Sequence, residues 1–278
     1  MTEMPVFRVA VLDLYNGEPN QGMRCIRTLL SEFSEKQGIT IFSQEFDLRR
    51  KLEIADLSFD AYISTGGPGS PIDSEGSDWE SKYFGLMDDI RSHNVACPEQ
   101  KKPVFLICHS FQIYCRYYGL GKVSKRKSTS FGVMPIHCAT AGITERYFSG
   151  MDDPFWAVDS RDWQVTQPDM RRIHEMGGDI LCIEKYRPHI RLERCVMAMR
   201  FDEVIFGTQF HPEADPVGML YYLKTDEKKN QVIEQHGEEK YNIMLDHLDD
   251  PDKIVLTYNT IIPHFLEHAV SLLKQPIS

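Results

Sequence analysis

Short apolar runs alternate with amphipathic segments over the first part of the chain. Three runs, at 6–14, 39–46 and 59–64, have the length and composition of strands buried in a sheet. Between the first two, residues 21–36 place apolar side chains at three- and four-residue spacings and Gly38 follows, which predicts an amphipathic helix packed on the sheet. Strands that alternate with helices are joined by right-handed crossovers, so the pattern predicts an α/β fold on a largely parallel sheet.

A strand, a sharp turn and a helix are expected in succession after Pro103. The apolar run 104–107 lacks alternation, as expected for a strand covered on both faces. Cys108 follows directly, and an amphipathic helix over 109–118 begins at once. This order places the cysteine above the carboxyl end of the strand, where a helix N-terminus favours a thiolate and free N–H groups can stabilise an oxyanion. A buried structural cysteine is the alternative.

The remaining segments extend the sheet and add helices. Further helices are expected at 48–55 and 79–94, and further strands at 129–139, 155–165, 179–184, 196–201 and 204–210. The two-residue gap formed by Asp202 and Glu203 is typical of a hairpin, so some late strands are antiparallel. The predicted fold class is therefore α/β, with a central mixed but mostly parallel sheet between layers of helices.

The pattern becomes helical after residue 213. Helices are expected at 219–232, 240–248 and 254–273. Pro263 should kink or delay the last of these helices. We therefore expect an α/β domain over 1–213 and a helical extension over 214–278 packed on it. The extension is a solvated elaboration, a lid over a pocket or a docking surface for a partner.

Composition and charge narrow the classes of function. Hydrophobic residues make up 42% and charged residues 26% of the 278, as in ordinary globular proteins, and a net charge of −10 disfavours nucleic acid as a partner. The basic cluster at 122–127 is expected to be a solvated turn. Seven cysteines without C-x-x-C spacing indicate a reducing cytoplasm, and neither a disulfide framework nor a thiolate zinc site. The first residues lack signal-peptide features, and no apolar run reaches the roughly 18 residues of a membrane helix.

A glycine-rich loop, 65–71, follows the third expected strand. Its sequence, Thr-Gly-Gly-Pro-Gly-Ser-Pro, could cradle a phosphate through N–H groups, but no Gly-Lys-Ser/Thr follows and two prolines remove donors. At the carboxyl end of a strand, such a loop can instead supply an N–H beside a nucleophile. A plain tight turn is the alternative.

The last expected strand runs into Gln209-Phe210-His211-Pro212-Glu213. His211 and Glu213 are two residues apart, so in extended backbone their side chains point to the same side. A carboxylate beside a histidine can fix its tautomer and stabilise the imidazolium, which is the role of the third member of a catalytic triad. The cysteine turn, the glycine loop and this pair all follow expected strands, where an α/β active site is assembled.

Together these motifs resemble the class I, or triad-type, glutamine amidotransferase family, in the form of a stand-alone domain similar to that of GMP synthases. The family has a Gly-Gly-Pro-Gly loop, a G-x-C-x-G-x-Q turn and a strand that ends in Q-F-H-P-E. The corresponding segments here are 66–69, 106–112 and 209–213. The resemblance covers about 6–213 and implies a flavodoxin-like, three-layer sandwich.

The resemblance also implies a reaction and assigns residues to it. Cys108 attacks the side-chain amide of glutamine to give a γ-glutamyl thioester and ammonia, and water then releases glutamate. His211 acts as general base and acid, and Glu213 orients it. The implied oxyanion donors and substrate contacts are the N–H groups of Gly67 and His109, and then Gln112, Gly66 and Gly69. No metal or cofactor is implied.

Three features differ from the family pattern. Leu106 and Ser110 replace the glycines at −2 and +2 from the cysteine. The stretch 158–163 has no histidine, whereas the family carries one there that lines the glutamine pocket. The histidine at 109 also resembles the intracellular-protease-like branch of the superfamily, although a partly exposed side chain at the helix start is the simpler interpretation.

Three functions are consistent with these residues. The first is a glutamine amidotransferase or glutaminase that passes ammonia to a synthetase on a separate chain, since no nucleotide site is evident. The second is a hydrolase of γ-glutamyl peptides or amides with the same triad, suggested by the altered stretch 158–163. The third is a binding or regulatory protein without the activity, suggested by Leu106. Glutamine or a γ-glutamyl compound is the expected ligand, and neither nucleic acid nor a membrane is an expected partner.

Overall fold

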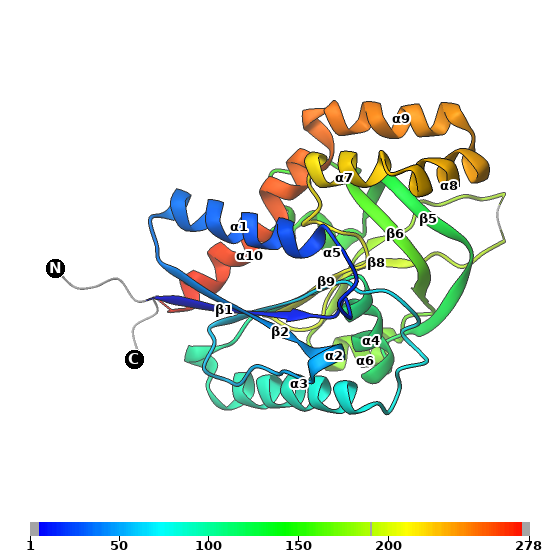
Figure 1. The fold of residues 1–278 in the computed structure, drawn as a ribbon. Coiled ribbons are helices and arrows are strands. Elements are labelled where there is room, and N and C mark those ends of the chain that lie inside the picture. Colours follow the sequence, from blue (N-terminus) through cyan, green and yellow to red (C-terminus); the bar gives the residue numbers. More distant parts are fainter. Residues whose placement is uncertain (1–5, 190, 274–278) are drawn as a thin grey trace.

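The computed structural model describes residues 6–189 and 191–273, and its centre is a nine-stranded sheet with the order β2-β1-β3-β4-β9-β8-β7-β5-β6 (Figure 1). The strands are β1 (Phe7–Asp13), β2 (Ile41–Asp47), β3 (Ala61–Ser64), β4 (Val104–Ile107), β5 (Lys122–Cys138), β6 (Phe155–Thr166), β7 (Asp179–Ile183), β8 (Val196–Arg200) and β9 (Ile205–Thr208). Neighbours from β2 to β9 pair in parallel, and neighbours from β9 to β6 pair antiparallel. The expected mixed sheet is confirmed, with the two kinds of pairing in equal number.

Helices cover both faces of this sheet. They are α1 (Gly22–Gln37), α2 (Leu48–Lys51), α3 (Asp78–Ala96), α4 (His109–Tyr117), α5 (Thr140–Ile143), α6 (Met170–Glu175), α7 (Pro216–Leu223), α8 (Asp226–His236), α9 (Glu238–Asp249) and α10 (Leu256–Leu273), with short helical turns η1 (Pro98–Gln100), η2 (Arg146–Phe148) and η3 (Pro251–Val255). Figure 1 shows α1 and α10 on one face and α2, α3, α4 and α6 on the other. The expected α/β sandwich is therefore confirmed. In the described part of the chain, no helix has the length and apolar character needed to cross a membrane.

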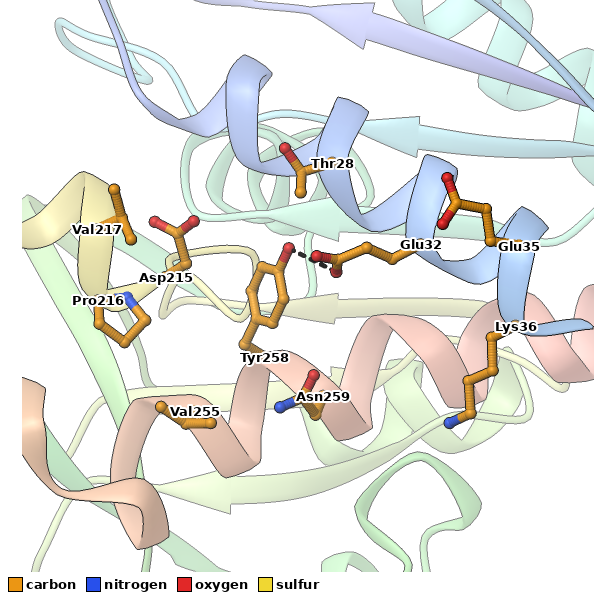
Figure 2. A pocket seen from close by; sticks show the side chains of 10 residues that line it. All are labelled: Thr28, Glu32, Glu35, Lys36, Asp215, Pro216, Val217, Val255, Tyr258 and Asn259. Carbon is orange, nitrogen blue, oxygen red and sulfur yellow. Dashed lines mark hydrogen bonds between the residues drawn. The ribbon is translucent and has the colours of Figure 1, made fainter.

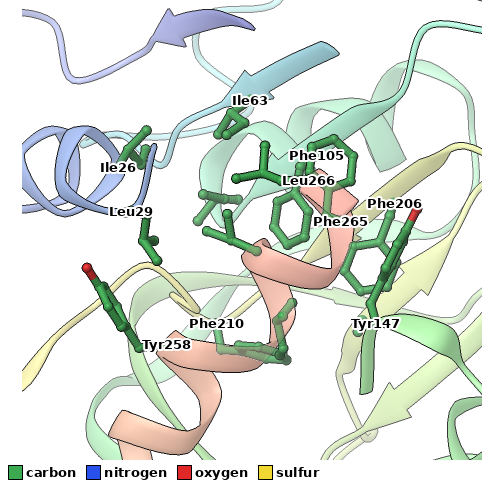
Figure 3. Packing of buried hydrophobic residues seen from close by; sticks show 14 of the residues in the cluster. Ile26, Leu29, Ile63, Phe105, Tyr147, Phe206, Phe210, Tyr258, Phe265 and Leu266 are labelled. Carbon is green, nitrogen blue, oxygen red and sulfur yellow. The ribbon is translucent and has the colours of Figure 1, made fainter. Parts of the chain in front are cut away.

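Strand β4 is buried on both faces, as its unbroken apolar run predicts. Phe105 and Ile107 belong to the hydrophobic cluster beneath α1 and α10, whereas Val104 and Leu106 belong to the cluster beneath α3 and α4. Figure 3 shows Phe105 beside Phe265 of α10, and their ring centroids are 5.3 Å apart. The strand that leads into the cysteine is thus held from both sides by close packing.

Two predicted boundaries near the sheet are wrong. The basic cluster 122–127 lies in β5 and not in a turn, because the strand already pairs with β6 from Lys122. The short helix α2 ends at Lys51, before the expected residue 55, because Leu52 adopts a left-handed conformation with a φ of 57°. Helices α5 and α6 were not predicted from the sequence.

The C-terminal segment is helical, as expected, but it is divided differently. The expected helix 219–232 is two helices, α7 and α8, because the Thr225 side chain accepts a hydrogen bond from the N–H of Lys228 and starts a new helix. Helices α7 to α9 pack on β5 and β6 around a separate apolar cluster that includes Leu223 and Met244. Helix α10 packs into the main core and continues through Pro263.

Candidate active site

Cys108 stands at a strained turn between β4 and α4. Its φ of 49° and ψ of −95° are a conformation that residues other than glycine rarely adopt. Its N–H donates to the carbonyl oxygen of Thr208 at the end of β9, at 2.7 Å. A backbone of this kind costs about 1–3 kcal/mol and persists only where the surroundings enforce it, as at active sites. The turn therefore fixes the side chain of Cys108 above the carboxyl ends of β4 and β9.

Both residues that differ from glycine at this turn are accommodated. The hydroxyl of Ser110 accepts from the N–H of Ile107 at 2.8 Å and donates to the carbonyl oxygen of Ser64 at 2.9 Å, so it ties the turn to β3. Leu106 lies in register with Gly207 on β9, and a Cβ on that glycine would lie 3.2 Å from the Cβ of Leu106. Because Gly207 has no side chain, β9 leaves room for the side chain of Leu106.

His211 and Glu213 form a buried pair. Their Nδ1 and Oε1 atoms are 2.8 Å apart, and the main chain of His211 is held by its N–H, which donates to the carbonyl oxygen of Val158 at 2.8 Å. Burial lowers the pKa of His211, but the Glu213 carboxylate and the Cys108 sulfur outweigh burial and raise this pKa well above its ordinary value. The arrangement favours a protonated imidazole beside the sulfur.

Gly66 lies where the imidazole and the cysteine meet. A Cβ built on this glycine would be 2.9 Å from Cε1 of His211 and 3.6 Å from the Cβ of Cys108. The hydroxyl of Tyr15 is 3.6 Å from the same point. The structure therefore brings Cys108, His211 and Glu213 together around Gly66, at the sheet edge that the sequence indicates.

The glycine loop is pinned in place. A Cβ on Gly67 would lie 2.4 Å from the carbonyl oxygen of Leu14, so only glycine fits there. Arg49 donates to the carbonyl oxygens of Pro68 at 2.6 Å and of Leu14 at 3.2 Å. Among the residues described, the N–H of Gly67 donates to no protein acceptor. Gly69 has a φ of 89° and lies beside Arg49, and its contact with substrate stays a prediction.

The side chain of His109 is buried, so the expected partly exposed position is wrong. Burial, followed by Arg49 and Arg116, lowers the pKa of this imidazole to about 3. Its Nε2 atom has no hydrogen-bond partner within the described ranges. The ring is thus a neutral part of the core. Its main-chain N–H begins α4, where intrahelical acceptors are absent, and its oxyanion role stays a prediction.

Gln112 is also buried, and its amide is engaged by the protein. Its Nε2 donates to the carbonyl oxygen of Trp163 at 3.2 Å and to Oε1 of Gln209 at 3.1 Å. The Nε2 of Gln209 in turn lies 3.6 Å from the sulfur of Cys108. Only the Oε1 atom of Gln112 is left to accept a hydrogen bond from a substrate.

The family model of "Glutamine amidotransferase class-I" matches residues 22–219. The chain belongs to the class I glutamine amidotransferase family. The described structure is similar to a glutamine amidotransferase from Thermotoga maritima, with a TM-score of 0.67 at 13% identity over 96% of this chain and 99% of that one. It is also similar to the glutaminase domain of a CTPS from Trypanosoma brucei with bound acivicin, with a TM-score of 0.56 at 12% identity over 98% and 96%. At these identities the likeness shows the fold alone.

One relative is named for a different activity. A homoserine O-acetyltransferase from Acetivibrio thermocellus is 29% identical over 157 residues. The match covers 56% of this chain and 46% of that protein, so the chain spans less than half of its length.

The stretch 158–163 of β6 lines the candidate site with main-chain carbonyl oxygens. The carbonyl oxygen of Ser160 is 3.9 Å from the sulfur of Cys108. Within this stretch, Arg161 is buried, and its guanidinium donates to Asp159 at 2.8 Å and to Glu184 at 3.4 Å. Arg161 therefore links β6 to the residue that follows β7.

Three further residues of the candidate site were not predicted from the sequence: Gln209, Tyr15 and Arg49. Gln209 is the first residue of the motif 209–213, and this position could have indicated that it lies in the site. Tyr15 follows β1, and its position at the carboxyl end of that strand was the available signal. Burial, followed by Glu213 and Cys108, raises the pKa of Tyr15 well above its ordinary value, so its hydroxyl stays a donor.

The groove drawn in Figure 2 is separate from the candidate site. That groove of about 720 Å³ lies between α1, α10 and the start of α7, and none of the three triad candidates lines it. Its Tyr258 hydroxyl donates to Glu32 at 3.1 Å. Across the described ranges, no group of three or more His, Cys, Asp or Glu side chains is arranged to hold a metal ion.

Proposed function

We propose that this chain hydrolyses the side-chain amide of glutamine through a γ-glutamyl thioester on Cys108. The observation that carries the proposal is the buried His211–Glu213 pair facing a strained cysteine across Gly66. A nucleophile, a base and a group that orients the base are the components of covalent amide hydrolysis. Membership of the class I family supports the same reaction.

The first half of the reaction forms the thioester. The Cys108 thiolate attacks the amide carbon, and the N–H groups of Gly67 and His109 stabilise the developing oxyanion. The His211 imidazolium donates its proton to the leaving nitrogen, so that ammonia departs and the thioester remains. The raised pKa of His211 suits this step, because a protonated imidazole is then present near neutral pH.

The second half consumes water. Neutral His211 accepts a proton from the attacking water, the tetrahedral intermediate collapses, and glutamate leaves with the Cys108 thiolate restored. Glu213 holds the imidazole through both halves and stabilises its charged form. Ammonia then passes to a synthetase on a separate chain.

The relative named homoserine O-acetyltransferase favours a second candidate function. In that reaction the same cysteine would carry an acyl group from a thioester donor, and a substrate hydroxyl would take the place of water. The two functions share the acyl-enzyme and differ in the donor and the acceptor.

The test compares the donors directly. Purified protein is given glutamine, a γ-glutamyl dipeptide, or an acetyl thioester with homoserine, and ammonia, the free amino acid and the O-acetyl product are measured. The proposal predicts ammonia from glutamine, at least 10³-fold less in Cys108→Ser, and unchanged release in Cys97→Ser, a matched control at a partly exposed cysteine. Turnover of the dipeptide alone, or O-acetyl product alone, would replace the proposed function. No reaction and no labelling of Cys108 by a glutamine-mimicking electrophile would leave a binding protein.

A further inference from the structure

We propose that Gln209 is a positioning residue that directs an N–H group at the sulfur of Cys108, and that Trp163 and Gln112 fix the direction of this hydrogen bond. This inference rests on the proposed role of Cys108 as nucleophile. It concerns the state of the sulfur before any substrate binds.

Three hydrogen bonds link Trp163, Gln112, Gln209 and Cys108, and the carbonyl oxygen of Trp163 fixes which group donates in each. The main-chain carbonyl oxygen of Trp163 can only accept, so Gln112 must turn its NH₂ group toward it. The second hydrogen of the same NH₂ group points to Gln209, which must therefore present its oxygen, at 3.1 Å. The NH₂ group of Gln209 is then left on the side of the Cys108 sulfur, 3.6 Å away.

The three residues of this hydrogen-bond series lie on different parts of the fold. Gln112 is on α4, one turn after the cysteine, and Trp163 is paired with Lys125 in the β5–β6 ribbon. The main-chain N–H of Gln209 donates to the carbonyl oxygen of Met197 on β8, at 2.8 Å. Both glutamine side chains are buried, at 2% and 0% exposure, so water does not compete for their amide groups.

An N–H aimed at sulfur favours the thiolate over the thiol. Hydrogen bonds to a charged acceptor are about twice as strong as those to a neutral one, and the same donor fixes the rotamer of the cysteine. In Gln209→Glu the side chain can still accept from Gln112, but it presents a carboxylate oxygen to the sulfur. In Gln209→Met the shape is largely kept and the donor is lost.

The test measures alkylation of Cys108 by iodoacetamide as a function of pH, with the modified peptide identified by mass spectrometry. For Gln209→Met we expect the midpoint of the profile to rise by about one pH unit, for Gln209→Glu by more, and the rate at pH 7 to fall about tenfold or more. The alkaline plateau should be unchanged, because the cysteine stays accessible. A merely structural role would lower the plateau and leave the midpoint in place, and that result would overturn the proposal.

Two further variants keep the test decisive. Gln164→Met removes another amide that contacts a cysteine, since Gln164 accepts from the sulfur of Cys195 at 2.9 Å, and it should leave the Cys108 profile unchanged. If the Gln209 variants do not fold, Gln112→Met tests the same relay, because Gln209 is then free to rotate its amide, and we expect a rise of the midpoint in the same direction. An unchanged midpoint in a folded Gln112→Met would overturn the proposal. Alkylation needs no glutamine turnover, so a shifted midpoint in a protein that releases no ammonia removes the proposed function and leaves this inference standing.

Discussion

At the scale of single residues, the site depends on one buried carboxylate. Glu213 is almost fully buried, its Oε1 binds Nδ1 of His211, and its Oε2 has no hydrogen-bond partner among the residues described. A buried carboxylate with one hydrogen-bond partner favours the protonated form of that partner, since an isolated carboxylate is costly in a poorly solvated interior. The pair therefore links the protonation of the base to the stability of the fold.

Replacing Glu213 by Gln should lower the pKa of His211 and remove a pH-dependent part of the stability. The folded-state pKa of His211 is raised, so its pairing with Glu213 adds to the free energy of unfolding. This stabilisation is fully present below about pH 6.5, the ordinary pKa of histidine, and is lost as the pH rises through the folded-state pKa. The difference in free energy of unfolding between wild type and Glu213→Gln should therefore be larger at pH 6 than at pH 9 in urea titrations. A difference that is constant with pH, together with an unchanged NMR titration of the His211 ring, would contradict this.

A methyl group on Gly66 should disable the site without unfolding the protein. In Gly66→Ala the new Cβ would lie 2.9 Å from Cε1 of His211, so the imidazole must leave its observed position. A displacement near 1 Å can cost about 10²-fold in rate, and we expect a loss of this size in ammonia release. The control is Gly85→Ala on α3, where a Cβ meets no atom within 4 Å among the residues described. Wild-type activity in Gly66→Ala would show that the ring does not act from its observed position.

At the scale of elements, β4 and β9 share the space beneath the site. Leu106 fills the position where the family has glycine, and the paired residue on β9 is Gly207. The absence of a side chain on Gly207 leaves room for the side chain of Leu106 beneath the turn. On β6, Arg161 forms a buried ion pair with Asp159 on either side of Ser160, whose carbonyl oxygen lies near the sulfur of Cys108.

Gly207→Ala should therefore destabilise the fold. Its Cβ would lie 2.9 Å from the rings of Phe111 and Phe201 and 3.2 Å from the Cβ of Leu106, and overpacking of this kind costs about 1–3 kcal/mol. In the Leu106→Gly background the same change should cost less, because the contact with the Leu106 Cβ is gone. Urea unfolding of the four proteins gives the coupling. Equal costs in both backgrounds would mean that the two strands do not compensate for one another.

The succession of the strands along the chain and the strand ends that carry the candidate residues could be predicted from the sequence, because Cys108, His211 and Gly67 all follow apolar runs. The elements that depend on long-range contacts could not. The basic start of β5 is a strand because it pairs with β6, and Gln209 lies beside Cys108 because β9 pairs with β4. The local sequence pattern does not indicate which strand a segment will pair with.

At the scale of the whole molecule, the C-terminal segment is divided between two clusters. Helices α7 to α9 cover the β5–β6 ribbon, whereas α10 lies against the main sheet and packs Phe265 on Phe105, three residues before the nucleophile candidate (Figures 1 and 3). We propose that 214–278 is an extension of the domain over 1–213 and not a separate folding unit. The core beneath the site is then incomplete without α10.

Phe265→Ala should consequently lower the free energy of unfolding by about 3–5 kcal/mol, because it empties a fully buried position in the main core. Leu223→Ala, in the cluster of α7 to α9, should cost about 2–5 kcal/mol. Chemical denaturation followed both by tryptophan fluorescence and by circular dichroism should give one transition for both variants. Separate transitions for the two parts of the chain would contradict a single cooperative unit.

The most direct test of the account is to look for the acyl group on the protein. Wild-type protein is mixed with glutamine, quenched in acid after milliseconds to seconds, and its peptides are analysed by mass spectrometry. The account predicts a γ-glutamyl group on the peptide that carries Cys108 in wild type and in Cys97→Ser, and none in Cys108→Ser. Ammonia release without this adduct, or an adduct on another cysteine, would contradict it.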